Sequence, residues 1–341
     1  MVDTRWRCAP PSAAPSTTAA APEAVWPAFV EAVAGEWEGV TATFTSTGTP
    51  KPLPERYVPE ASDGCACARV DTAATCRHAS PLLCLPCLQA YREWGIELTD
   101  WQSQCSVRAD ESGLAVVHRR MMPTVGCEAD AIAFTQEQAA LLQAGTAGNA
   151  IAADGSYSTA PSSTKLVDPA LPTTALQTCL ALAPRQRLRL VHVLRRMGAD
   201  ARWQLAEIEL HQERWDGPYT GKLELSGCGG GLDGFATSAP LDAALLDGPW
   251  LAHGVRHHIA PSGKASASMV VEGEAWMVPH SPLCLPLNTW SSLAVEDGQL
   301  ALTAGVLCEH EMSMRVLSRR QAPGEGAVVE FLELRRAFKG F

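Results

Sequence analysis

Strict alternation of apolar and polar side chains marks several short segments of this chain. Val40–Thr45 alternates in this way, and so do Arg187–Leu194 and Ala206–Leu210. A period of two places successive side chains on opposite faces of a strand, so each segment is predicted to be a half-buried β-strand. In Arg187–Leu194 the leucines and His192 share one face, which we expect to point inward, and the arginines share the other.

Two helix-like segments each stop at a glycine that is followed two residues later by a tryptophan. Residues 22–34 stop at Gly35 before Trp37, and residues 238–247 stop at Gly248 before Trp250. A glycine lets the chain turn sharply, and a tryptophan has the size to close one end of a β-barrel. We therefore predict an all-β fold with two antiparallel barrels in tandem, each entered by a short helix. Each tryptophan is expected to stack on an arginine from a late strand, chosen from Arg187, Arg189 and Arg214 in the first barrel and from Arg335 and Arg336 in the second.

Composition and turn signals divide the chain into parts. The predicted parts are a disordered tail or transit peptide at 1–21, a first barrel at 22–225, a linker at 226–240 and a second barrel at 241–341. The tail is rich in Ala, Pro, Ser and Thr and has no secretory apolar core, which leaves both interpretations open.

Residues 62–90 interrupt the strand pattern of the first barrel. Five cysteines fall there, and the pattern resumes smoothly when Ala61 is joined to Tyr91. A structural zinc site usually needs two well-formed ligand pairs, whereas only Cys84 and Cys87 have the C-x2-C spacing. We expect an insertion without a structural role, either genuine or a translated intron. The seven other cysteines are scattered, which favours a reducing compartment.

Charge and hydropathy exclude two classes of partner. The 341 residues carry a formal net charge of −10, whereas nucleic-acid binding normally requires a basic face. No run of 18 apolar residues is present, so no transmembrane segment is predicted.

Few side chains indicate chemistry. His192 is the one titratable residue predicted to point inward, and it is interpreted either as a hydrogen-bonded core residue or as a ligand contact. The acid pair Glu207 and Glu209 is expected to be solvated, and His118 suggests no role. His253, His257 and His258 are expected on the surface. No hydrolase, zinc-protease or nucleotide-binding motif is present, so no catalytic residue, metal or cofactor is predicted.

The Gly-x-Trp element after a short helix resembles the signature of lipocalins and the wider calycin group. Other segments resemble a two-domain, lipocalin-like family of cyanobacteria, algae and plants to which no function is assigned. These segments are residues 37–41, 91–94, 100–102, 187–192, 285–290 and 304–307. The resemblance covers residues 26–61 and 91–341 and fails at 62–90. Related calycins include bilin lyases and pigment-handling proteins. The resemblance therefore implies a chloroplast location, or otherwise a cytoplasmic one.

Three functions follow as expectations. The first is binding of a small hydrophobic molecule, a tetrapyrrole, carotenoid or lipid, inside the first barrel. The expected contacts are Phe44, Leu98, Trp101, Leu190 and His192. The second is a lyase or isomerase acting on such a pigment, although a non-enzymatic role is favoured. The third is an assembly factor whose barrels are packed solid, with a protein partner that the sequence does not identify.

Overall fold

The structure, a computed structural model, describes eleven segments of the chain. They are residues 22–53, 99–110, 113–121, 135–142, 148–163, 173–197, 202–222, 235–296, 298–308, 312–322 and 324–337. The predicted tail 1–21, the insertion 62–90 and Leu98 lie outside them. Of the predicted linker 226–240, only residues 235–240 are described.

Strands dominate the described residues. The first half contains α1 (Pro22–Val33), β1 (Gly35–Thr45), β2 (Asp100–Asp110), β3 (Gly113–Met121), β4 (Thr135–Leu142), β5 (Ala150–Ile151), β6 (Tyr157–Ser158), β7 (Ser162–Ser163), β8 (Thr173–Ala183), β9 (Gln186–Met197) and β10 (Arg202–Gly217). Two 3₁₀ helices follow, η2 (Phe235–Thr237) and η3 (Ala243–Leu246). The second half contains β11 (Trp250–Ile259), β12 (Ala265–Trp276), β13 (Leu283–Leu285), β14 (Thr289–Glu296), β15 (Gln299–Cys308), β16 (Ser313–Gln321) and β17 (Ala327–Arg336).

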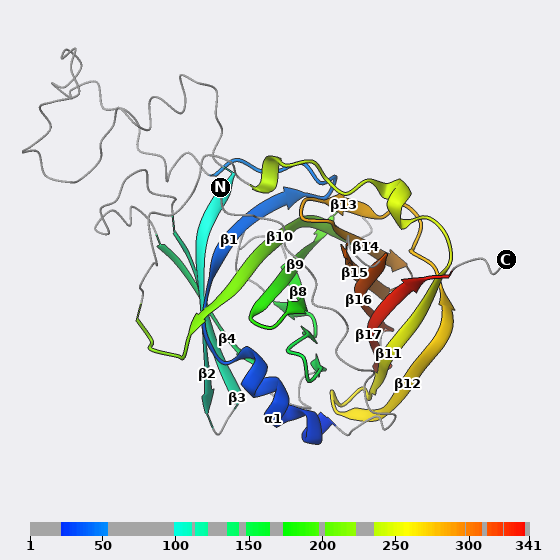
Figure 1. The fold of residues 1–341 in the computed structure, drawn as a ribbon, viewed down its shortest axis with the longest axis horizontal. Helices are drawn as coiled ribbons and strands as arrows, with labels where there is room; N and C mark the ends of the chain where they lie inside the picture. The colour runs from blue at the N-terminus through cyan, green and yellow to red at the C-terminus, as the bar shows by residue number, and fades with distance from the viewer. Residues whose placement is uncertain are drawn as a thin grey trace, which may run out of the picture.

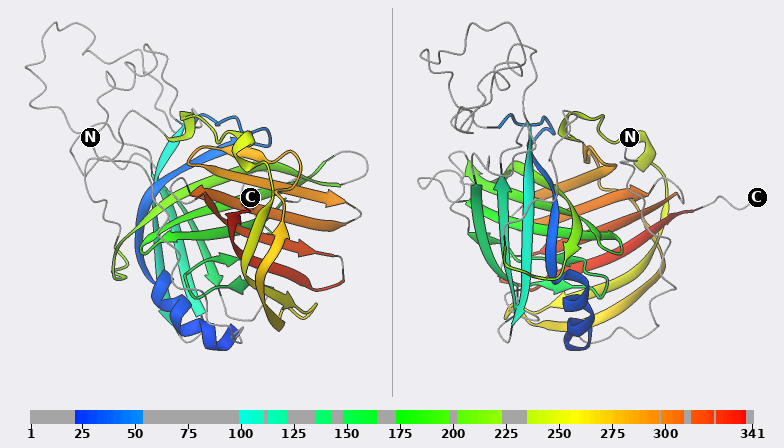
Figure 2. Two further views of the ribbon diagram at one scale, coloured as in Figure 1. Left: turned by 45° about the vertical axis from the view of Figure 1, so that its right-hand side comes forward. Right: turned by 60° about the vertical axis from the view of Figure 1, so that its left-hand side comes forward.

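These strands form two antiparallel sheets, one from each half of the chain (Figures 1 and 2). The first sheet has the order β4-β3-β2-β1-β10-β9-β8-β6-β5, with β7 paired to β8, and the second has the order β12-β11-β17-β16-β15-β14-β13. The first sheet is preceded by α1 and the second by η3. The all-β fold class predicted from the sequence, with one antiparallel sheet in each half, is confirmed.

The two faces of the first sheet have different neighbours. One face carries Trp37 and is covered by Phe29 and Val33 of α1, and we call it the inner face. The other face carries Phe44 and Leu190, which pack against the second sheet, and we call it the contact face. In β1 and β9 the odd-numbered residues lie on the inner face and the even-numbered residues on the contact face, as the period of a strand requires.

A shared hydrophobic cluster joins the two halves. Phe44 and Leu190 of the first sheet belong to the same buried cluster as Leu285, Ala304 and Val329 of the second. Each half also has a cluster of its own, around Trp37 in the first and around Trp250 in the second. The two barrels predicted in tandem therefore do not have fully separate cores, because burial of the contact face depends on both sheets.

The two Gly-x-Trp elements have matching geometry. Gly35 and Gly248 have φ angles of 123° and 106°, a region that favours glycine. Each indole then folds back onto its preceding helix. Trp37 Nε1 donates to Val33 O over 2.9 Å, and Trp250 Nε1 donates to Leu246 O over 3.1 Å.

An arginine stacks on each of these indoles. The guanidinium carbon of Arg187 lies 3.8 Å from the Trp37 ring centroid, and that of Arg336 lies 4.6 Å from the Trp250 centroid. Both arginines belong to the sets predicted from the sequence. Arg336 also donates to the backbone carbonyls of Leu245 and Asp247, whereas Arg187 donates to Glu213.

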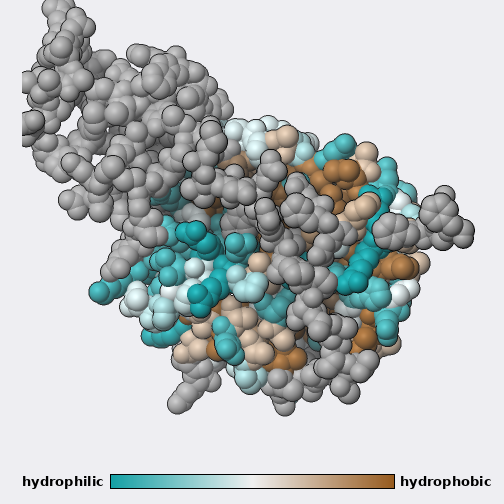
Figure 3. Space-filling model, viewed as in Figure 1, coloured by the Kyte–Doolittle hydropathy of each residue, from teal (hydrophilic) through white to brown (hydrophobic). Residues whose placement is uncertain are grey.

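The exposed surface is unevenly apolar. Most of the exposed large hydrophobic side chains belong to the second half, among them Leu251, Met269 and Met277. In Figure 3 the brown surface accordingly lies mostly towards the right, where Figure 1 places the second sheet. No helix among the described residues is both long enough and apolar enough to cross a membrane.

Candidate functional site

The strand register aligns charged side chains on the inner face of the first sheet. Arg187 of β9 is opposite Glu213 of β10, and Glu213 is opposite Gly39 of β1. On the other side of β1, Gly39 is opposite Ser103 of β2, which is opposite Arg120 of β3. Directly opposed residues of an antiparallel sheet point to the same face. One row across five strands therefore carries three charged groups.

The adjacent rows add two histidines. His211 of β10 lies between Arg189 and Thr41, and His118 of β3 is opposite Cys105 in the row of Trp37. Together with Glu209 these residues form what we call the charged cluster. Its members are Thr41, His118, Arg120, Arg187, Arg189, Glu209, His211 and Glu213, and none is more than 5% exposed.

Ion pairs connect the arginines of the cluster to its two glutamates. Glu213 accepts from Arg187 Nε over 2.6 Å and from Arg189 Nη2 over 2.8 Å, and Glu209 pairs with Arg120. Burial by itself would raise the pKa of both carboxyls. The adjacent guanidiniums have the opposite effect and are stronger, because they lower the pKa of Glu209 to about 2 and hold the pKa of Glu213 below its usual range.

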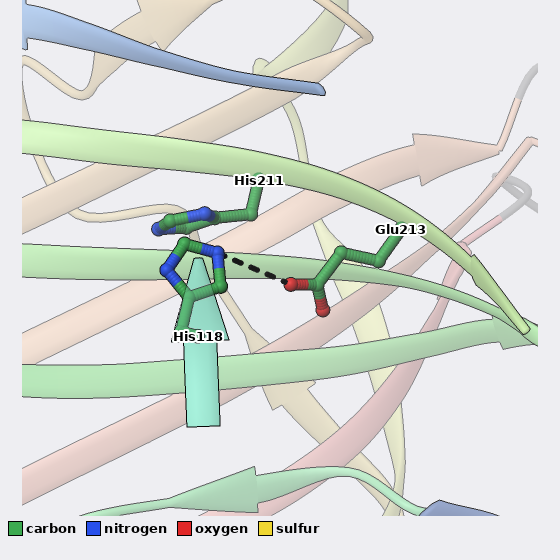
Figure 4. A group of neighbouring side chains, drawn as sticks. All are labelled: His118, His211 and Glu213. Carbon is green, nitrogen blue, oxygen red and sulfur yellow. Dashed lines mark ion pairs between the residues drawn. The ribbon is translucent and has the colours of Figure 1, made fainter. Parts of the chain in front are cut away.

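The two histidines meet edge to face at the centre of the cluster. Their ring centroids are 4.6 Å apart, and His118 Nε2 lies 3.9 Å from Glu213 Oε1 (Figure 4). His211 Nδ1 is 2.6 Å from Thr41 Oγ1, and its Nε2 is 3.5 Å from Glu209 Oε2. Burial, reinforced by Arg189, lowers the pKa of His211 to about 4. Burial and nearby cationic arginines hold the pKa of His118 well below its ordinary value.

The cluster carries a net positive charge. Both histidines are neutral at pH 7, so the charges are three guanidiniums and two carboxylates, which leaves one positive charge. An uncompensated charge in a buried environment is costly. Among the described residues no third carboxylate pairs with these arginines.

Several polar atoms of this face have no hydrogen-bond partner among the described residues. They are Ser103 Oγ, His118 Nε2, Arg120 Nε, Arg189 Nε and His211 Nε2. Most buried polar groups of native proteins are hydrogen-bonded, so five unpartnered atoms on one face are unusual. The hydrogen-bonding capacity of these buried atoms is not used by any described residue.

A metal ion is one molecule that this geometry suggests. The ligand atoms of His118, His211 and Glu213 lie within 4.8 Å of one another, and two neutral imidazoles with a carboxylate are a known donor set for zinc. The surrounding charge argues against it. The arginine field that opposes a proton on either histidine would oppose a divalent cation more strongly, and Arg189 already occupies Glu213 Oε1. The cluster is therefore better suited to an anion.

The chain has structural similarity to a solved protein but no match to a protein-family model or a curated protein. The chain is similar to the crystal structure of a protein of unknown function from the DUF3598 family of Nostoc punctiforme. The two chains share 14% sequence identity over 92% of this chain and 98% of that one, with a TM-score of 0.45. A similarity of this size carries no argument about function.

An apolar end adjoins the charged cluster on the inner face. The side chains of Phe29, Trp37, Val107, Leu114 and Tyr157 form a buried cluster with the thiols of Cys105 and Cys179. Burial raises the pKa of Cys179 to about 12 and also raises that of Cys105, so both are neutral thiols at pH 7. Among the described cysteines, Cys105, Cys179 and Cys284 are free, whereas Cys308 is disulfide-bonded, which a reducing compartment does not explain.

The residues expected to contact a ligand lie on both faces of the sheet. Phe44, Leu190 and His192 are fully buried on the contact face, where His192 Nε2 is 2.7 Å from Ser291 Oγ of the second sheet. Only Trp101, opposite Thr41, lies in a row of the charged cluster. The expectation that the leucine face of β9 points into the first barrel is wrong, because the second sheet covers that face. Whether these residues bind a ligand stays a prediction.

Other polar residues were also misplaced by the sequence interpretation. Glu207 and Glu209 were expected to be solvated, but they are 8% and 4% exposed, and Glu207 accepts from Lys51 Nζ over 2.6 Å. His257, expected on the surface, is 6% exposed and lies 2.8 Å from Ser268 Oγ. His118 was dismissed, although it lies in the charged cluster.

One signal for the cluster was present in the sequence. The two strands predicted at Arg187–Leu194 and Ala206–Leu210 are neighbours in the sheet, and the arginines of β9 pair with a glutamate of β10. That glutamate is Glu213, which lies three residues beyond the alternating segment Ala206–Leu210. Opposite charges in facing columns of two strands indicate pairing, but solvated and buried pairs have the same sequence pattern.

Proposed function

We propose that the protein binds a small hydrophobic molecule on the inner face of its first sheet, in the manner of a calycin. The helix that covers this face, the Gly-x-Trp element and the stacked arginine support the calycin comparison. The apolar side chains around Trp37 offer a surface for a hydrophobic body. The tetrapyrroles, carotenoids and lipids of photosynthetic cells remain the candidate ligands, and the chloroplast remains the proposed location.

The observation that carries this proposal is the set of unpartnered polar atoms beside that apolar surface. A core that serves only to stabilise a fold gains nothing from buried donors without acceptors, each of which costs about 1–3 kcal/mol. A ligand site needs such groups, because a few polar atoms on an apolar wall orient the bound molecule.

A pigment-modifying lyase or isomerase is the second candidate, and His211 is the observation that favours it. Its imidazole lies between a hydroxyl and a carboxylate, within 2.6 Å of Thr41 Oγ1 and 3.5 Å of Glu209 Oε2. A general acid or base must be within hydrogen-bond reach of the group with which it exchanges a proton, and His211 Nδ1 is within that reach of the Thr41 hydroxyl. His192, the residue nominated from sequence, faces the second sheet instead.

Binding is tested with retinol and retinoic acid as probes, because both absorb where tryptophan emits and so quench its fluorescence on binding. We expect saturable binding at one molecule per chain. Cys105→Leu adds bulk to the inner face and is expected to weaken binding at least tenfold, whereas Cys284→Leu in the second sheet is the matched control. Circular dichroism establishes that both variants are folded.

Protein isolated from its native source supplies an independent result. Organic extraction followed by mass spectrometry should release one small molecule in stoichiometric amount. If no such molecule is extracted and neither probe binds, the barrels are packed solid, as expected for an assembly factor, and the binding proposal is wrong.

A further inference from the structure

We infer that the molecule bound at the charged cluster is a monocarboxylic acid, whose carboxylate is held by Arg120 and Arg189. This inference rests on the proposed function and specifies the chemical class of the ligand. It is carried by the charge balance of the cluster and by the positions of its unpartnered donors.

The charge balance calls for one negative charge. Three guanidiniums face two carboxylates, and the two histidines are neutral at pH 7. A single carboxylate brings the described cluster to zero. A carotene has no charge and would leave the excess positive charge uncompensated, whereas a tetrapyrrole with two propionates would reverse its sign. Because buried net charge is costly in either sense, the monoanion is favoured.

The donors for a carboxylate lie on two sides of the cluster. Arg120 uses Nη2 for Glu209, and Arg189 uses Nη2 for Glu213, so the Nε of each arginine is left without a partner. Both side chains are at least nine-tenths buried. Guanidinium groups present N–H donors in the planar geometry that carboxylate oxygens match, and buried pairs of this kind are strong.

His211 completes the set of donors. When the Thr41 hydroxyl donates to Nδ1 over 2.6 Å, the imidazole carries its proton on Nε2, which has no hydrogen-bond partner among the described residues. A neutral imidazole then donates one hydrogen bond to an incoming carboxylate. Ser103, opposite Arg120, has an unpartnered Oγ on the same face and adds a hydroxyl.

The apolar cluster around Trp37 is where the hydrocarbon part of such an acid would lie. Cys105 of β2 is paired with Trp37 of β1 on one side and with His118 of β3 on the other. A single strand therefore separates the apolar side chain of Trp37 from His118 of the charged cluster. A long-chain or isoprenoid acid has its charge at one end and an apolar body beyond it. This matches the order of the surface, with charge at Arg120 and Arg189 and apolar side chains around Trp37.

Retinoic acid and retinol test the inference, since they share one polyene and differ only in the head group. We expect wild-type protein at pH 7.5 to bind the acid at least tenfold more tightly than the alcohol. In Arg120→Gln and in Arg189→Gln this preference should fall to about one, with the affinity for the alcohol retained. The matched control is Arg256→Gln, which removes an arginine from a part-buried pair in the second sheet and should keep the preference.

The wild-type comparison decides the question even if the arginine variants do not fold. Equal affinities for acid and alcohol would overturn the inference while leaving the proposed binding function intact. Tighter binding of biliverdin, which carries two propionates, would also overturn it. Stoichiometric binding of Zn²⁺ that is lost in His118→Gln would show a metal site instead. If neither retinoid binds, the proposed function and the inference are both wrong.

Discussion

Three buried neutral histidines give this protein a predicted dependence of stability on pH. His118, His192 and His211 are each at most 5% exposed. Burial lowers the pKa of His192 to about 3, and burial with the field of Arg189 lowers the pKa of His211 to about 4. The pKa of His118 is lowered in the same direction, also chiefly by burial. The perturbation to apply is a decrease in pH from 7 to 5.

The sign follows from proton binding in the two states. In the unfolded chain each imidazole has its ordinary pKa, near 6.5, whereas in the folded protein the ring stays neutral down to pH values near 4 or 3. Below pH 6.5 the unfolded state therefore binds more protons, and the free energy of unfolding decreases as the pH falls. The decrease continues until the pH reaches the folded-state pKa values.

The magnitude is large compared with the stability of an ordinary domain. Between pH 7 and pH 5 each histidine with such a shift lowers the free energy of unfolding by about 2 kcal/mol. His192 and His211 together contribute about 4 kcal/mol, and His118 adds to this in the same direction. Typical proteins have about 5–15 kcal/mol in total, so mild acid should bring this one close to unfolding.

Urea unfolding at pH 7, 6 and 5, followed by tryptophan fluorescence, measures the effect. His211→Gln keeps a hydrogen-bonding side chain next to Thr41 but cannot take up a proton, so its loss of stability between pH 7 and pH 5 should be about 2 kcal/mol smaller than that of wild type. His280→Gln, at an exposed position, is the control and should behave as wild type. An identical pH dependence in His211→Gln and wild type would refute the reasoning.

Three further predictions follow from the packing. Glu213→Gln leaves two buried guanidiniums without their carboxylate and should cost about 3–5 kcal/mol in a urea titration, whereas Glu207→Gln, which breaks a pair with a half-exposed lysine, should cost at most about 1 kcal/mol. Trp37→Ala and Trp250→Ala should each lower the free energy of unfolding by about 3–5 kcal/mol. Because the halves share a hydrophobic cluster, each change should lower the melting temperature of both halves. Two separate transitions in calorimetry would contradict this. Deleting residues 62–90 shortens the connection between the paired strands β1 and β2 and should leave circular dichroism and melting temperature nearly unchanged, so a large loss of stability would show a structural role.

Local features of the sequence determined the strands and the ends of the barrels. Alternation in Val40–Thr45 and Arg187–Leu194 predicted β1 and β9, because the period of side-chain direction in a strand depends only on the backbone. The Gly-x-Trp elements predicted the turns at Gly35 and Gly248, since a positive φ angle next to a helix end is also a local requirement. The sequence restricted the arginine partner of each tryptophan to a few candidates on late strands, and the tertiary structure decided which of them stacks.

Only the tertiary structure decided which face of each strand points where. Alternation separates two faces but does not say which is inner, and in β9 both are buried, one in the charged cluster and one under the second sheet. The leucine face therefore looked inward from the sequence and proved to be the contact between the halves. His192 meets Ser291 there, 99 residues away along the chain.

The charged cluster depends on the tertiary structure for the same reason. It joins Thr41 of β1, His118 of β3 and Glu213 of β10, residues far apart in the chain that the strand register makes neighbours. A charged residue in a strand has the same sequence pattern whether water or protein surrounds it. Whether it remains solvated or becomes part of a buried site is decided by the segments that pack over it, which is a property of the whole fold and of no single stretch of sequence.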